Sequence, residues 1–183
     1  MSDPMQRAMD VDAFLAWSEG QEGRFELHDG AVVAMAPERS AHLLSKGAVY
    51  IALVEAIRRA GLACTAYPDG ATVRTASHSA YEPDALVRCG APLPRDQVKI
   101  ADPVVVVEVL SPSTAGVDHG VKLLGYFTMP SVVHYLIVNP EQRMVIHHKR
   151  GVGDALETRI LGEGVLMLDP PALDIGVESL FGI

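Results

Sequence analysis

The sequence is poor in cysteine, and this shortage excludes a zinc site built from cysteines. Cys64 and Cys89 are the two cysteines among 183 residues, and their spacing matches no metal-binding motif. In a reducing compartment, a pair of this kind is most simply interpreted as two thiols. We therefore expect two buried thiols, with a disulfide between them as the less favoured alternative.

The sequence also lacks a targeting segment and a long apolar run. Its first residues are acidic and include Pro4, unlike a secretory signal or an arginine-rich transit peptide. The longest apolar runs, such as 104–107 with its neighbours, are far shorter than the roughly 20 residues that a membrane helix needs. We therefore expect a cytoplasmic protein that makes no contact with a membrane.

Positive charge is in short supply as well, since the formal net charge is −8. Proteins that hold DNA by its phosphates usually present a basic face. The charge therefore argues against tight, metal-free binding of DNA. It leaves open a local basic patch, or a divalent metal ion that bridges acidic side chains to phosphates.

The length and composition suit one globular domain, because 49% of the residues are hydrophobic and 21% are charged. The alternation of helical and strand patterns predicts an α/β fold with a sheet of mixed strand directions, and no domain boundary within 1–183. The predicted helices are 10–19, 40–60 and 117–128, the second with Ser40 as its N-cap and an apolar face of Leu43, Leu44, Ala48, Ile51, Val54 and Ile57. The predicted strands are 24–28 and 31–35, joined by an Asp29-Gly30 turn, then 62–67, 71–74, 85–89, 103–110 and 132–138, and a final meander at 144–148, 155–161 and 165–168.

Glu108 interrupts the most hydrophobic stretch of the chain. It lies inside the run PVVVVEVL at 103–110, whose lack of alternation predicts a central strand buried on both faces. A buried carboxylate is costly unless it is paired or bound to a metal ion, and such exceptions are typical of functional sites. The alternative is a structural role near the strand end, bonding a helix N-terminus or an arginine.

Two further residues gain weight from their positions around Glu108. Asp84 follows Pro83 at the head of a predicted strand, where by itself it is typical of a turn or a cap. Lys122 lies between Asp118 and Tyr126 at spacings of four, and by itself would form a solvated pair with Asp118. Together, a strand carboxylate, a tight turn and a helix with a lysine facing back are able to converge on one point.

These residues belong to a longer pattern that resembles the Uma-two family of restriction endonucleases, in the PD-(D/E)xK nuclease superfamily. The bare superfamily pattern is unspecific, but EVLSPST followed by D-x₃-K-x₃-Y is specific to this family. The resemblance covers about 24–150. It is carried by Arg24-x-Glu26-Leu27-x-Asp29-Gly30, Met35-x-Pro37, His42, Pro83-Asp84, Glu108–Thr114, Asp118-x₃-Lys122-x₃-Tyr126 and Val138-Asn139-Pro140.

The resemblance implies a restriction endonuclease-like fold, a mixed sheet flanked by helices, with an N-terminal hairpin and a C-terminal β meander. It implies that Asp84, Glu108 and the backbone carbonyl of Val109 hold Mg²⁺, with Mn²⁺ as an alternative ion, and that Lys122 is the catalytic lysine. One departure stands out, because the position two after Glu108 is Leu110 and the lysine has moved to the following helix.

The family pattern implies supporting roles for three other residues. Tyr126 lies one helical turn after Lys122, where it is placed to support Lys122 or to contact nucleic acid. Glu26 and His42 recur in the pattern. Against a role in the site, a carboxylate on a hairpin strand usually faces solvent, and a histidine near a helix start usually lies close to the cap or is partly buried.

The favoured function is Mg²⁺-dependent hydrolysis of DNA by an endonuclease. A catalytically weak or inactive binding or assembly module on the same fold is the alternative, favoured by the acidic charge. A hydrolase of phosphorylated small molecules comes third. We also expect a homodimer, because the C-terminal strands and Leu180-Phe181 offer a sheet edge or an apolar patch.

Overall fold

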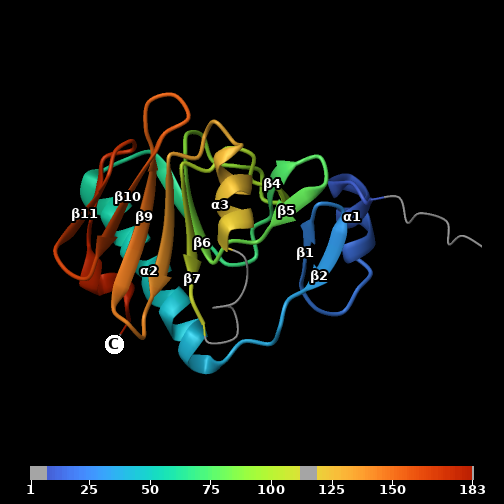
Figure 1. Ribbon diagram of the computed structural model, residues 1–183, viewed down its shortest axis with the longest axis horizontal. Coiled ribbons are helices and arrows are strands. Elements are labelled where there is room, and N and C mark those ends of the chain that lie inside the picture. Colours follow the sequence, from blue (N-terminus) through green and yellow to red (C-terminus); the bar gives the residue numbers. More distant parts are fainter. Residues whose placement is uncertain (1–7, 112–118, 183) are drawn as a thin grey trace, which may run out of the picture.

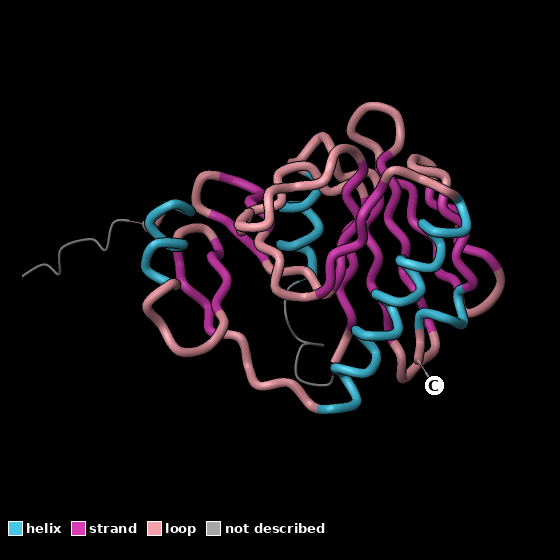
Figure 2. Tube along the Cα trace, turned by 180° about the vertical axis from the view of Figure 1, so that it is seen from behind, coloured by secondary structure: helices cyan, strands magenta, loops and turns pink. Residues whose placement is uncertain are grey.

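The computed structural model describes residues 8–111 and 119–182, and its centre is a six-stranded sheet in the order β10-β9-β8-β7-β6-β3. The sheet is mixed, because β7 and β8 run parallel and the other neighbours run antiparallel. Helix α2 covers one face and α3 the other (Figures 1 and 2). The elements are α1 (Val11–Ser18), β1 (Phe25–His28), β2 (Ala31–Ala34), α2 (Ser40–Ala60), β3 (Cys64–Pro68), β4 (Val73–Ala76), β5 (Ser79–Tyr81), β6 (Ala85–Cys89), β7 (Val105–Val109), α3 (His119–Phe127), β8 (His134–Asn139), β9 (Met144–Arg150), β10 (Leu156–Leu161), β11 (Val165–Leu168), β12 (Leu173–Gly176) and a final 3₁₀ turn (Val177–Leu180).

The prediction of a mixed α/β fold is confirmed, and its central strand is β7. Every residue of β7 is buried, as its unbroken apolar sequence indicated. Val105, Val107 and Val109 pack into the core under α2, whereas Val106 packs into the core under α3. Glu108 follows the same alternation and therefore lies on the α3 side of the sheet.

A second sheet, in the order β2-β1-β5-β4, lies at one end of the molecule beside α1 (Figure 1). The predicted hairpin is present, and both of its turn residues have positive φ, 48° at Asp29 and 81° at Gly30. Strand β5, which is not among the predicted strands, joins β1 to β4. This sheet matters for the site because β1 carries Glu26.

Helix α2 has the predicted length, but the predicted apolar face is only partly right, because Ile57 is buried and Val54 packs against the core while three other residues are exposed. Leu43, Leu44 and Ile51 are 53%, 74% and 56% exposed. Arg39 rather than Ser40 is the N-cap, and it makes no side-chain cap hydrogen bond. Apolar residues lie all around this helix, so periodicity alone did not determine which face packs on the sheet. The buried face consists of Lys46, Val49, Ala52, Leu53, Ala56 and Ile57.

By length and composition, α2 is the one described helix that meets the criteria for a membrane span, with 33% of its most apolar window buried. This is weak evidence, because core helices of soluble proteins meet the same criteria.

The C-terminal segment belongs to the core under α2. The hairpin β11–β12 packs there, and Leu180 and Phe181 are 0% and 6% exposed. The expectation that these two residues form a surface patch is therefore wrong, because their side chains fill the space beneath α2. The homodimer stays a prediction, and β10 is the open edge of the large sheet on that side of the molecule.

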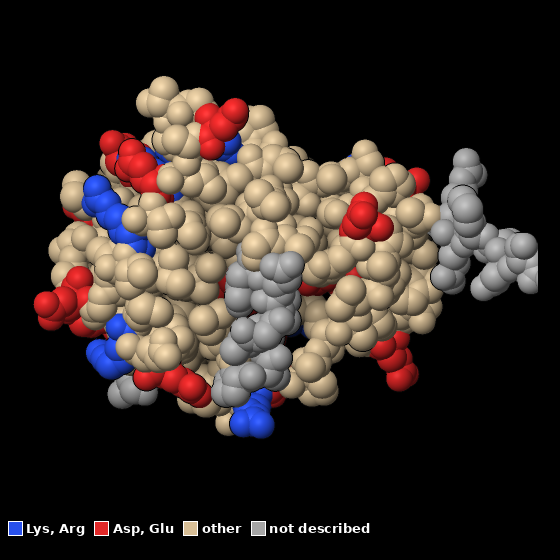
Figure 3. Space-filling view, in the orientation of Figure 1, with Lys and Arg blue, Asp and Glu red and all other residues tan. Residues whose placement is uncertain are grey.

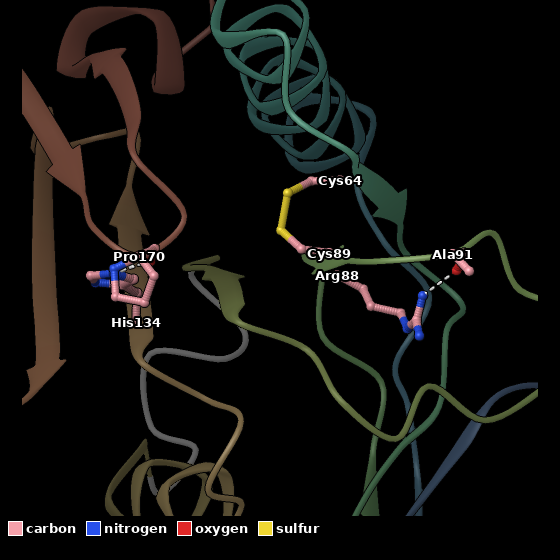
Figure 4. The surroundings of a disulfide bond; sticks show 6 residues. All are labelled: Cys64, Arg88, Cys89, Ala91, His134 and Pro170. Carbon is pink, nitrogen blue, oxygen red and sulfur yellow. Dashed lines mark hydrogen bonds between the residues drawn. A yellow bond between two sulfur atoms is a disulfide. The ribbon is translucent and has the colours of Figure 1, made fainter.

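The expectation of two free thiols is also wrong, because Cys64 and Cys89 form a disulfide (Figure 4). The two residues are directly opposite each other in the antiparallel pairing of β3 with β6. The expectation rested on the redox compartment, which carries no information about strand register. Beside the bridge, Arg88 donates a hydrogen bond to the carbonyl of Ala91 and pairs with Asp102, so it joins the end of β6 to the segment that follows it.

Candidate active site

Asp84, Glu108 and Lys122 come together on the α3 side of the large sheet. The register between β6 and β7 pairs Ala85 with Val107, so Asp84, just before β6, lies opposite Glu108. Lys122 approaches from α3, and its Nζ lies 3.0 Å from Glu108 Oε1. The topology therefore places the three residues of the predicted set in one cluster, all of them buried.

Glu108 is held by two donors from α3. Its Oε1 accepts hydrogen bonds from Lys122 Nζ at 3.0 Å and from the Tyr126 hydroxyl at 2.8 Å. Burial raises the pKa of Glu108 to about 7, with Asp84 and Glu26 adding to the rise and Lys122 opposing it. Burial and the two neighbouring carboxylates therefore outweigh the lysine that contacts this carboxyl group directly.

Lys122 is shared between two carboxylates. Its Nζ lies 2.8 Å from Glu26 Oε1 as well as 3.0 Å from Glu108. Burial lowers the pKa of Lys122, but Glu108 and Glu26 more than reverse this and raise it above the ordinary value. Lys122 therefore stays a cation, and its two partners among the described residues leave one of its three N–H donors for a further partner.

Glu26 belongs to the cluster, so the alternative of a solvent-facing strand carboxylate is wrong. Its side chain is buried and also accepts from the backbone N–H of Glu82 at 2.9 Å, while His28 Nε2 lies 2.9 Å from its Oε2. Burial raises the pKa of Glu26, but His28 and Lys122 lower it below the ordinary value. Glu26 therefore stays ionised and gives the Lys122 amine a negatively charged partner.

Asp84 connects this cluster to α2. Its Oδ2 accepts a hydrogen bond of 2.6 Å from the backbone N–H of Val109, and its Oδ1 lies 2.8 Å from Lys46 Nζ. Lys46 also binds Glu38 at 2.6 Å and Asp69 at 2.5 Å. Burial lowers the pKa of Lys46, but Asp84 and its other carboxylate partners raise it above the ordinary value.

Lys46 and the ion pairs around it were not predicted from the sequence. Arg24 extends them, because it binds both Asp69 and Glu82. The signal was present in the helix, since Lys46, Val49 and Leu53 follow a helical spacing that continues the true buried face. A lysine in the middle of a helix is usually solvated, so the apolar pattern gave no reason to include this one.

A cavity of about 570 Å³ opens over these side chains, within the size range of ligand-binding pockets. Asp84, Glu108, Val109 and Lys122 line its floor, and Glu38 and His42 line the side formed by the start of α2. Of the residues that carry the family pattern, Pro112, Ser113, Thr114 and Asp118 lie outside the described residues.

The ion-paired side chains in and beside the cavity include more carboxylates than cations. We call this set the ionic cluster; its carboxylates outnumber its cations six to three. The carboxylates are Glu26, Glu38, Asp69, Glu82, Asp84 and Glu108, and the cations are Arg24, Lys46 and Lys122.

The donor set fits the divalent ion that the family pattern implies. Glu108 uses Oε1 for both of its α3 donors, so neither of them occupies Oε2. Asp84 lies opposite it and contributes a second carboxylate, and Val109 lines the same cavity. Carboxylate and carbonyl oxygens are the ligands that Mg²⁺ prefers, and a cation would relieve the repulsion between the two carboxylates.

A family model described as "Uma2: Putative restriction endonuclease" matches residues 11–180. The chain belongs to the Uma2 family. A crystal structure from Anabaena variabilis ATCC 29413, described as "a putative nuclease belonging to DUF820", has a TM-score of 0.74 at 16% identity and covers 94% of this chain and 97% of that one. At this identity the likeness shows the fold, which is the nuclease-type fold expected from the sequence.

Two relatives of this Uma2 chain come from Synechocystis sp. (strain ATCC 27184 / PCC 6803 / Kazusa). "Uncharacterized protein slr1290" is 29% identical over 175 residues, covering 93% of this chain and 90% of the relative. "Uncharacterized protein sll1609" is 35% identical over 91 residues, covering 48% of this chain and 51% of the relative. Neither name carries an activity.

His134 and His147 lie outside the residues that line the cavity and are both buried. His134 Nε2 lies 2.8 Å from the carbonyl oxygen of Pro170, so this nitrogen carries a proton (Figure 4). His134 Nδ1 then accepts, and His147 Nε2, 2.9 Å away, donates to it. Burial lowers the pKa of both rings from 6.5 to about 4, so the pair is neutral in the folded protein.

This pair predicts a loss of stability in mild acid. Between pH 6.5 and about 4 the two histidines are protonated in the unfolded chain but stay neutral in the folded protein. The free energy of unfolding therefore falls as the pH falls through this window. We expect His147→Gln, which keeps a donor at the Nε2 position, to lose about 1–2 kcal/mol less than wild type between about pH 7.5 and about pH 5. Urea unfolding at the two pH values measures this, and equal losses would contradict it.

Proposed function

We propose that this Uma2 protein is a divalent-metal-dependent endonuclease that hydrolyses phosphodiester bonds in DNA. The observation that carries the proposal is the convergence of Asp84, Glu108 and Lys122 on the floor of one cavity. Two carboxylates and a lysine are the groups that this hydrolysis needs. The attacking water must lose a proton, and the negative charge of the phosphate, which repels the nucleophile, must be neutralised.

Each residue has a role that follows from its contacts. Asp84, Glu108 and the Val109 carbonyl would hold Mg²⁺ or Mn²⁺, which when bound supplies a Lewis acid for the water and the phosphate. Lys122 directs its remaining N–H to the water or to a phosphate oxygen, since Glu26 and Glu108 take the other two. Tyr126 is a positioning residue, because its hydroxyl fixes Glu108 Oε1.

Metal dependence also answers the objection raised by the net charge of −8. On the face shown in Figure 3, the lysine and arginine side chains of the described residues form separate groups rather than a continuous basic tract. A phosphate that approaches the ionic cluster meets an excess of negative charge, and a bound dication reverses this locally. We therefore infer that DNA binds through the metal ion, and that binding weakens when the ion is removed.

The test is nicking of a supercoiled plasmid with Mg²⁺ or Mn²⁺ by wild type and by Glu108→Ala. We expect the variant to be at least about 100-fold slower, because it loses a metal ligand and the acceptor for Lys122. Glu157→Ala, on the exposed face of edge strand β10, is the matched control and should cleave like wild type. Metal-dependent nicking that is equal in wild type and Glu108→Ala would overturn the assignment.

The second candidate is a binding or assembly module without activity, which the acidic charge favours. In that case no metal-dependent nicking would be seen, and calorimetry would detect no divalent-ion binding that depends on Asp84. We propose a cytoplasmic protein and a homodimer in either case, and sedimentation at micromolar concentration tests the dimer.

A further inference from the structure

Strand β10 is an edge of the six-stranded sheet and is exposed along most of its length. Among the described strands only β9 pairs with it, and its residues from Leu156 to Ile160 are all exposed. The strand contains no proline or glycine, and its register with β9 is continuous from Leu156 to Leu161. An edge strand of this kind presents unpaired N–H and C=O groups, which native proteins either block or pair with another strand.

The main-chain groups that point away from the sheet follow from a hydrogen bond at the turn before β10. The Gly151 N–H donates to the Ala155 carbonyl at 2.8 Å, and these two residues continue the β9–β10 register. In an antiparallel pair, hydrogen-bonded and non-hydrogen-bonded positions alternate along each strand. The N–H and C=O groups of Leu156, Thr158 and Ile160 therefore point outward, where they are available to a further strand.

The sequence of β10 is complementary to a second copy of itself. If two copies pair antiparallel about a two-fold axis at Thr158, the outward-pointing residues fall in hydrogen-bonded positions and supply about six main-chain hydrogen bonds. Glu157 of one protomer then lies opposite Arg159 of its partner, and symmetry repeats this pair. Leu156 lies opposite Ile160 in the same way.

These side chains have room for such partners in the single chain. Neither Glu157 nor Arg159 takes part in an ion pair among the described residues. Leu156 and Ile160 are 38% and 67% exposed. Opposite charges and apolar side chains that face each other across antiparallel strands stabilise the pair, whereas like charges destabilise it. Moving the axis by one residue, to Glu157 or to Arg159, would place like charges opposite each other, so charge favours the axis at Thr158.

We propose that two copies of this chain form a symmetric dimer by antiparallel pairing of their β10 strands about Thr158, which joins their two large sheets into one. This pairing specifies the contact surface of the homodimer proposed above and does not depend on nuclease activity. The described residues that line the cavity include none from β10, so each protomer has a whole candidate site. Nicking by Glu157→Ala should therefore stay at the wild-type level whether or not the dimer forms.

The experiment measures the dissociation constant of the dimer by sedimentation of the full chain at micromolar concentrations. We expect a wild-type dimer. Glu157→Arg and Arg159→Glu each place like charges opposite each other at both symmetric positions, so each should raise the dissociation constant at least about tenfold. An equimolar mixture of these two variants should recover the dimer, because each then presents the charges that the other lacks. Glu55→Arg, the same change at an exposed position of α2, is the matched control and should dimerise like wild type.

Two variants at the axis test the main-chain pairing separately. Thr158→Pro removes an N–H that points away from β9, so the single chain loses no sheet hydrogen bond while the pairing is interrupted at its centre. It should raise the dissociation constant at least about tenfold, whereas Thr158→Val keeps the N–H and should dimerise like wild type. Denaturant unfolding confirms that each variant is folded. A wild-type monomer at these concentrations would overturn the inference, as would charge variants that each dimerise as tightly as wild type.

Discussion

Replacing Lys122 by methionine should slow metal-dependent plasmid nicking at least about 1,000-fold and lower the free energy of unfolding by about 3–5 kcal/mol. The side chain is only 8% exposed, and its amine is the shared partner of Glu26 and Glu108. Methionine fills a similar volume but leaves two buried carboxylates without their cation. Activity falls because the donor for water or phosphate is lost, and stability falls because the carboxylates remain.

Two variants make this prediction specific. Lys122→Arg keeps the charge, so it should recover part of the stability, while the different shape of the guanidinium keeps nicking low. Lys99→Met is the matched lysine control. Lys99 pairs with Asp12 at the surface, so its replacement should lower the free energy of unfolding by less than about 1 kcal/mol. If Lys122→Met nicked DNA at the wild-type rate, Lys122 would have no part in catalysis.

The sequence was informative about Glu108 because burial and charge conflict there. A carboxylate inside an unbroken apolar strand has few structural explanations, and the strand is indeed buried throughout. Asp84 and Lys122 have no such conflict in their own surroundings. They were found through the family pattern, and their convergence depends on the β6–β7 register and on the placement of α3, which are set by long-range pairing.

The sequence was uninformative about α2 for a physical reason. Its apolar residues surround the helix, so which face is buried depends on its packing against the sheet and on its ion pairs with the ionic cluster. Lys46 is 5% exposed because it pairs with Asp69 and Asp84, which lie on later segments of the chain. A local sequence pattern does not contain such long-range contacts. Glu26 was left undecided for the same reason, since its partner Lys122 is 96 residues away.

Lys46 carries the second large prediction. Its amine contacts Glu38, Asp69 and Asp84 within 2.8 Å, and its side chain is 5% exposed. Lys46→Met in EDTA should therefore lower the free energy of unfolding by about 3–5 kcal/mol, because three carboxylates lose a common buried cation. Lys99→Met is again the matched control, and denaturant unfolding measures both.

The same variant distinguishes a structural lysine from one that balances the charge of a metal site. Without the amine, Glu38 and Asp84 keep their charge, and the proposed metal site at Asp84 should bind Mn²⁺ more tightly than in wild type. Added Mn²⁺ should then restore more stability to Lys46→Met than it adds to wild type, because an ion that binds only the folded state stabilises it in proportion to its affinity. An equal gain in both proteins would mean that Lys46 and the ion act on different carboxylates, and that Lys46 serves the fold alone.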